Sequence, residues 1–216
     1  MTKILSPSCL LLLLWILPGF ADPVRRVQNN VLISDTLPAI RIQIDPAFRF
    51  EGSFPFRIQD IAEGYRYVFI DGNPKEVKRM FIAQFESFLP ESTEIYRYNF
   101  DNALLMEGFR FRHSTFAFSM KEAMKENPDS EAAKTQTFLD KKGYTISDEW
   151  MASRFLTLGD DSRKSEMILF YMEPVASTGH KLGEFYKGEE RTELWERISK
   201  DLETRSRSAF RIQSHN

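Results

Sequence analysis

Hydrophobic and polar residues alternate along several short segments of the chain, with the period of two that is typical of half-buried β-strands. The clearest case is residues 40–45, where Ile40, Ile42 and Ile44 are separated by polar residues. Further segments of this kind are residues 48–50, 54–59, 65–71, 95–100 and 109–113. Since successive side chains of a strand point to opposite faces of its sheet, this pattern predicts a sheet with one apolar and one polar face.

Two other segments are rich in large apolar residues. Residues 75–89 fit either one face of a helix that begins near Asn73 and Pro74, or the second arm of a hairpin. We favour the strand, because the segment lies between two strand-like segments and is rich in Phe and Ile. Residues 166–173 form a short, almost wholly apolar run, which predicts a strand covered on both faces at the centre of the sheet.

The spacing of apolar residues predicts four helices. Asn127 and Pro128 stop the first, Asp129 or Ser130 caps the second, and Ser147 caps the third. The helices are expected over residues 116–126, 129–142 and 147–159, and over about four turns around residues 194–202.

The order of these elements is strands, then helices, then a strand and a helix, which favours an α+β fold. We expect a mostly antiparallel sheet of about five to seven strands with helices packed on one face. Residues 22–38 read as an extended lead-in, and residues 39–216 as a single α+β domain.

The N-terminus has the pattern of a cleavable signal peptide over residues 1–21. Lys3 provides the basic start, Leu10 to Leu17 the apolar core, and Gly19 and Ala21 the small residues before a cut at Asp22. The apolar core is shorter than the roughly 18 residues that span a bilayer, so we expect no transmembrane segment in the mature chain. An uncleaved anchor is the alternative.

Cysteine content indicates the compartment. The only cysteine, Cys9, lies within the predicted signal peptide, so the mature chain would be free of cysteine. Secreted animal domains usually contain disulfides, and the sequence also lacks an Asn-x-Ser/Thr glycosylation site. These features together favour an exported bacterial protein, either periplasmic or secreted.

Charge bears on the class of partner, and aromatic content bears on how the core is built. The 29 basic and 31 acidic residues nearly balance, which argues against nucleic acid as a partner. Aromatic residues make up 13% of the chain, and 19 residues are Phe. A core built of rings is the ordinary explanation, and an apolar cavity between the sheet and its helices is the alternative.

Arginine recurs beside aromatic residues in the predicted strands. If these segments are strands, the rings would point to one face of the sheet and the arginines to the other. Planar guanidinium groups that converge on one face suit a phosphate or a carboxylate. Pairing with nearby acids such as Glu86 and Glu94 would instead make this face an ordinary solvated surface. The candidate ligand-binding residues are Arg66, Arg97, Arg110, Arg112 and His113.

No motif for catalysis, a metal or a cofactor is present, so we expect no cofactor and assign no catalytic or metal-binding residue. His113 is adjacent to Ser114, but neighbouring residues of a strand point apart, so this pair does not predict a catalytic serine site. His180 and Glu184 are a weak metal pair. A hydrogen-bonded structural histidine is the simpler interpretation of His113.

We therefore expect binding rather than catalysis. The first hypothesis is a non-catalytic module for an anionic or amphiphilic small molecule, held by the arginine face or in an aromatic cavity. The alternative is a structural or protein-interaction component of the bacterial cell envelope. A hydrolase-type enzyme without a recognisable motif is the third. The sequence leaves the oligomeric state open.

Overall fold

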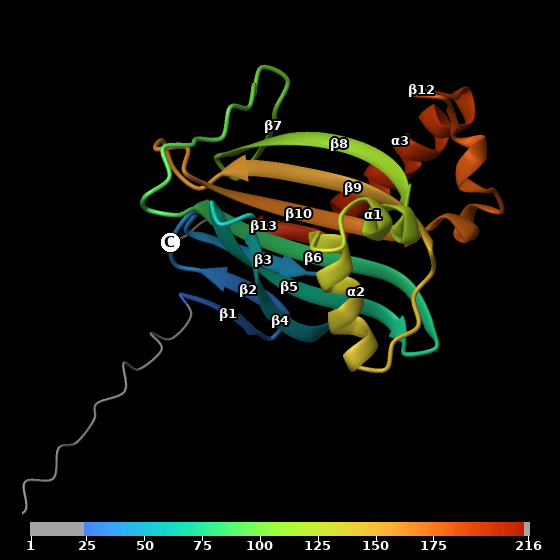
Figure 1. The fold of residues 1–216 in the computed structure, drawn as a ribbon, viewed down its shortest axis with the longest axis horizontal. Coiled ribbons are helices and arrows are strands. Elements are labelled where there is room, and N and C mark those ends of the chain that lie inside the picture. The colour runs from blue at the N-terminus through green and yellow to red at the C-terminus, as the bar shows by residue number, and fades with distance from the viewer. Residues whose placement is uncertain (1–23, 214–216) are drawn as a thin grey trace, which may run out of the picture.

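The computed structural model describes residues 24–213 and shows a mixed α/β protein built around one seven-stranded antiparallel sheet (Figure 1). The strand order is β4 (Arg49–Ile58), β5 (Ala62–Asn73), β6 (Glu76–Phe88), β10 (Ser165–Pro174), β9 (Glu149–Leu158), β8 (Phe109–Ser119) and β7 (Leu104–Met106). The expected mostly antiparallel α+β architecture is confirmed. Residues 1–21 lie outside the described residues, so the signal peptide and export stay predictions.

A second, four-stranded sheet packs against the first. Its order is β1 (Arg25–Gln28), β2 (Val31–Ser34), β3 (Ile40–Ile44) and β13 (Phe210–Gln213). Within the predicted lead-in of residues 22–38, β1 and β2 pair as a hairpin of the second sheet. Ile40, Ile42 and Ile44 of β3 are fully buried, as the alternation of residues 40–45 predicts. A short ribbon pairs β11 (Tyr186–Lys187) with β12 (Glu190–Arg191).

Helices pack on both faces of the large sheet, and the prediction that they pack on one face is wrong. We name the faces by their helices. On the α2 face, Val68 and Ile82 belong to a core that includes residues of α1 (Met120–Glu126) and α2 (Glu131–Lys141). On the α3 face, Phe69 and other rings share a core with α3 (Glu193–Ser208) and the second sheet.

The strands predicted over residues 48–50, 54–59, 65–71 and 109–113 fall largely in β4, β5 and β8, and four more predicted elements are confirmed. Residues 76–88 form a strand, β6, rather than a helix. The apolar run of residues 166–173 lies in β10, the fourth of the seven strands. Helix α2 begins after Ser130, whose hydroxyl accepts a hydrogen bond from the Ala133 N–H, and α3 follows a similar cap at Thr192.

Three predicted elements are wrong. Residues 147–159 form β9 rather than a helix, because β9 is covered on both faces and its run of apolar residues imitates helical spacing. Residues 116–119 end the strand β8, and α1 begins only at Met120. Residues 95–100 form no strand but belong to a loop. Arg163, between β9 and β10, donates hydrogen bonds to the carbonyls of Tyr96 and Tyr98 in this loop.

Two short 3₁₀ helices, η1 (Val175–Thr178) and η2 (Leu182–Glu184), connect β10 to the ribbon. Between residues 24 and 213, no helix is long and apolar enough to cross a membrane.

Candidate functional site

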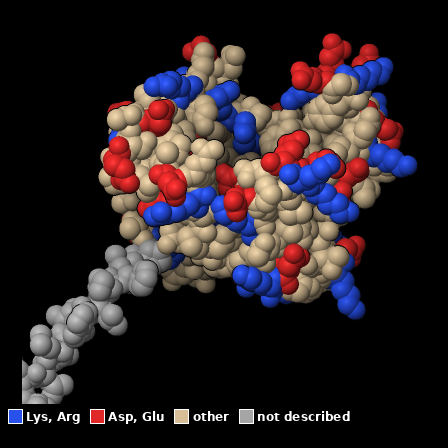
Figure 2. Space-filling model, viewed as in Figure 1, with Lys and Arg blue, Asp and Glu red and all other residues tan. Residues whose placement is uncertain are grey.

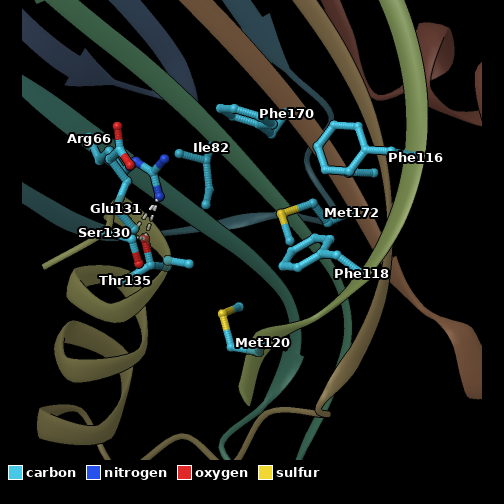
Figure 3. A pocket seen from close by; sticks show the side chains of 12 residues that line it. Arg66, Ile82, Phe116, Phe118, Met120, Ser130, Glu131, Thr135, Phe170 and Met172 are labelled. Carbon is cyan, nitrogen blue, oxygen red and sulfur yellow. Dashed lines mark hydrogen bonds between the residues drawn. The ribbon is translucent and has the colours of Figure 1, made fainter. Parts of the chain in front are cut away.

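A pocket of about 190 Å³ lies on the α2 face, between the first turn of α2 and strands β6, β8 and β10 (Figure 3). It lies between the helices and the sheet, where the Phe content of the sequence allows an apolar cavity as the alternative to a core of rings. The rings of Phe116, Phe118 and Phe170 are half-buried in its wall. Phe116 and Phe118 both reach it because they are two residues apart on β8. The other apolar residues that line it are Ile82, Met120, Ala132, Ala152 and Met172.

Arg66 of β5 is the cationic side chain of this pocket. It is only 8% exposed, and three of its N–H groups are used within the protein. Nε donates to Gln84 Oε1 at 2.6 Å, while Nη1 donates to the Glu131 carbonyl at 2.8 Å and to Thr135 Oγ1 at 2.7 Å. Helix α2 therefore fixes the direction in which the guanidinium points, as Figure 3 shows.

The charge of Arg66 lies over the rings of Phe56 and Phe170, at 5.9 Å and 5.7 Å from their centroids, but has no acidic partner in direct contact among residues 24–213. Within the same described range, its Nη2 group donates no hydrogen bond. Burial lowers the pKa of Arg66 to about 10, although the more distant charges of Glu131 and Glu86 oppose this shift. The side chain is therefore still a cation at neutral pH.

A buried pair of carboxyl groups lies beyond Gln84 on the same face. Glu86 and Glu166 are direct cross-strand partners on β6 and β10, and both are buried. Glu86 accepts hydrogen bonds from the Gln84 amide and, at 2.7 Å, from the Tyr96 hydroxyl. Burial and the charge of Glu86 raise the pKa of Glu166 to about 9, so Glu166 is protonated at neutral pH.

The sheet register places three of the predicted arginines on one face. Arg66, Gln84, Ile168, Leu156 and Arg112 are successive partners across five strands, so their side chains share the α2 face. Arg110 is two residues from Arg112 and also faces this way.

The structure does not bring these arginines together. Arg112 is exposed and lies over the Tyr98 ring at 5.4 Å, while Arg110 is exposed and donates to the Phe100 carbonyl. Arg97 is exposed in the loop before β7. Figure 2 shows basic and acidic side chains interspersed over the side in view, rather than a continuous basic area. Of the five candidates, only Arg66 lines the apolar pocket.

His113 points to the α3 face instead. Its Nε2 is 2.8 Å from Ser153 Oγ, which is 2.9 Å from Ser206 Oγ, and its Nδ1 is 3.7 Å from Glu203 Oε2. This resembles a Ser–His–carboxylate set, but Ser153 and Ser206 are both fully buried, and a substrate could not reach either hydroxyl. Burial lowers the pKa of His113. The arrangement fits a structural histidine that joins the sheet to α3.

Among residues 24–213, no three His, Cys, Asp or Glu side chains are placed together to hold a metal ion. Comparison with protein-family models, curated proteins and solved structures finds no match. The case for a function therefore rests on the pocket.

Proposed function

We propose that this protein is a non-catalytic binding module for an anionic amphiphile. The anionic group would accept hydrogen bonds from Nη2 of Arg66, and the apolar part would lie against Phe116, Phe118 and Phe170. The observation that supports this proposal is a buried guanidinium without an ion pair beside a mainly apolar pocket.

The physical reason is the cost of burying charge. A cation removed from water is strongly destabilising unless a partner of opposite charge or several hydrogen bonds compensate it. Three protein acceptors compensate Arg66 in part, and Nη2 still has two N–H groups to offer. An anion bound there would form a charge-assisted hydrogen bond in a site of low dielectric constant, where such bonds are strongest.

The shape of the site favours this hypothesis over the other two. A component of the cell envelope that recognises a protein would favour a broad surface, whereas Arg66 and the three rings line a pocket of about 190 Å³. An enzyme of the hydrolase type would need an accessible nucleophile, and the hydroxyl of Ser153 beside His113 is fully buried.

The test is a calorimetric titration of the folded protein with octanoate, octyl sulfate and uncharged octanol. We expect Arg66→Met to weaken binding of both anions by about tenfold or more, since a hydrogen bond to a charged group is lost. Binding of octanol should change little. Arg66→Met also removes the donor to Gln84, Glu131 and Thr135, so we expect this variant to be less stable than the wild type. Its fold is therefore checked by circular dichroism before the titration.

Arg41→Met is the matched control, because Arg41 is an exposed residue of β3 in the second sheet. It should bind all three compounds like the wild type. Equal affinity of the wild type and Arg66→Met for the anions, with both proteins folded by circular dichroism, would overturn the proposal.

A further inference from the structure

We infer that the anion suited to this pocket is a small monocarboxylate whose apolar part is a single aromatic ring. This inference rests on the proposed function and narrows the ligand class. It uses three separate properties of the site, namely its free donors, its neighbouring charges and the size and composition of its wall.

The donors at Arg66 suit a small anionic group. The Nε and Nη1 groups are occupied by Gln84, Glu131 and Thr135, which leaves the two N–H groups of Nη2. A carboxylate brings two oxygens, and a phosphate monoester brings three terminal oxygens. In a mainly apolar site, each acceptor without a hydrogen bond is costly, so the smaller group is favoured.

The charges near Arg66 favour a single negative charge. The negative charges of Glu131 and Glu86 are both close enough to raise the pKa of Arg66 against the effect of burial. A second negative charge on the ligand would be repelled by both. The start of α2 favours one anion here, because Ser130, Glu131 and Ala132 all line the pocket at the positive end of this helix.

The wall of the pocket suits one ring. Its volume is about 190 Å³, and an apolar cavity of about 150 Å³ is known to hold benzene. Phe116 and Phe118 have ring centroids 5.8 Å apart at an angle of 42°, and Phe170 lines the same space (Figure 3). Met120 and Met172 add sulfur atoms, which make favourable contacts with aromatic rings. A planar aromatic ring in the pocket can therefore contact both the phenylalanine rings and the methionine sulfur atoms.

The experiment is a calorimetric titration with phenylacetate, its uncharged analogue 2-phenylethanol, phenyl phosphate at pH 8 and octanoate. We expect phenylacetate to bind about tenfold or more tightly than each of the other three. Arg66→Met should remove this preference over 2-phenylethanol, because both ligands then meet a pocket without the cation.

A pocket-filling variant tests the place of the ring. Ala132→Leu should weaken phenylacetate binding by about tenfold or more, since Ala132 lines the pocket on α2. Ala133→Leu is the matched control, because Ala133 is the next residue of the same helix and does not line the pocket. Leucine is a good helix former, so both variants should keep α2.

The outcomes separate the two proposals. Phenyl phosphate or octanoate binding at least as tightly as phenylacetate, and weakened by Arg66→Met, would overturn the ligand class and leave the proposed function standing. Equal loss of phenylacetate binding in Ala132→Leu and Ala133→Leu would overturn the placement of the ring. Binding of all anions that is unaffected by Arg66→Met would overturn the proposed function itself.

Discussion

Arg66 and Glu166 face the same side of the sheet and are connected through Gln84 and Glu86, yet burial affects their charges differently. Arg66 stays a cation at neutral pH because its lowered pKa is still about 10. Glu166 becomes neutral there because its pKa is raised to about 9. Arg66 therefore keeps a positive charge that can bind an anion, whereas Glu166 is uncharged because it is buried.

The raised pKa of Glu166 predicts how stability depends on pH. Its pKa in the folded protein lies above that of an unfolded glutamate, so the favourable contribution is complete at pH values below the unfolded pKa. The contribution is lost as the pH rises toward about 9. We therefore expect the free energy of unfolding, measured with urea, to fall between pH 5 and pH 9.

Glu166→Gln tests the cause, because glutamine is neutral at every pH. The variant should show a flatter pH profile and be more stable than the wild type at pH 8 by several kcal/mol, since each pKa unit corresponds to about 1.4 kcal/mol. The groups near Glu166 that also carry or can carry charge are Glu86, Tyr98 and Arg154. An unchanged pH profile in Glu166→Gln would assign the dependence to those groups instead.

Gly64 of β5 lies where two neighbouring strands leave no room for a side chain. It lies in β5 opposite Phe56 of β4, and a Cβ atom at this position would lie 2.3 Å from the Phe85 carbonyl oxygen. Gly64→Ala should therefore destabilise the protein by about 1–3 kcal/mol, measured by urea unfolding, because the backbone of β6 must move. Gly183→Ala, where a Cβ atom meets no neighbour within 4 Å, should change stability far less. Equal effects would mean that the strands adjust freely.

Element type was predictable wherever a segment has one exposed face. The alternation in β3 and the amphipathic spacing in α3 indicate their type because only one side is buried. In β9, Trp150 and Ala152 pack on the α2 face while Met151 and Phe155 pack on the α3 face, so neither period remains visible. The second sheet was hidden for another reason, since β3 finds its partner β13 at the far end of the chain.

Of the residues that line the candidate site, the sequence predicted only Arg66 as a ligand-binding residue. The period of two in residues 65–71 separates Arg66 from Tyr65 and Tyr67, and the structure keeps that separation. The sequence contains no signal that α2 would cover Arg66, because this contact joins residues 66 and 135. Phe116 and Met120 have helical spacing in the sequence, and this hid the turn from β8 into α1 that brings both to the pocket.

Residues 24–213 form two cores that share the large sheet. Phe210 of β13 belongs to the core on the α3 face, with ring centroids 5.5 Å from Phe81 and 5.3 Å from Phe155. Leu139 of α2 is fully buried in the core on the α2 face. Because both cores depend on the same strands, we expect them to unfold together.

Two substitutions test this cooperativity. Phe210→Ala should cost about 3–5 kcal/mol and Leu139→Ala about 2–5 kcal/mol, each with one unfolding transition. Trp150 and Trp195 lie in different cores, so tryptophan fluorescence reports on both. If the cores unfold together, its midpoint should equal the midpoint from circular dichroism. Leu105→Ala, at a residue that is 73% exposed, should have almost no effect. Two separate transitions in either core variant would contradict a shared sheet.

The pairing of β3 with β13 also bears on how the chain is made. Ile42 and Ile212 are partners in this ladder, although roughly 170 residues separate them. At about 5–20 residues per second, β3 is synthesised roughly 10 to 30 seconds before β13. Throughout that time the apolar strand β3 of the nascent chain has one edge without a partner, and this edge can pair with strands of other chains. The last strand to be synthesised thus protects one of the first.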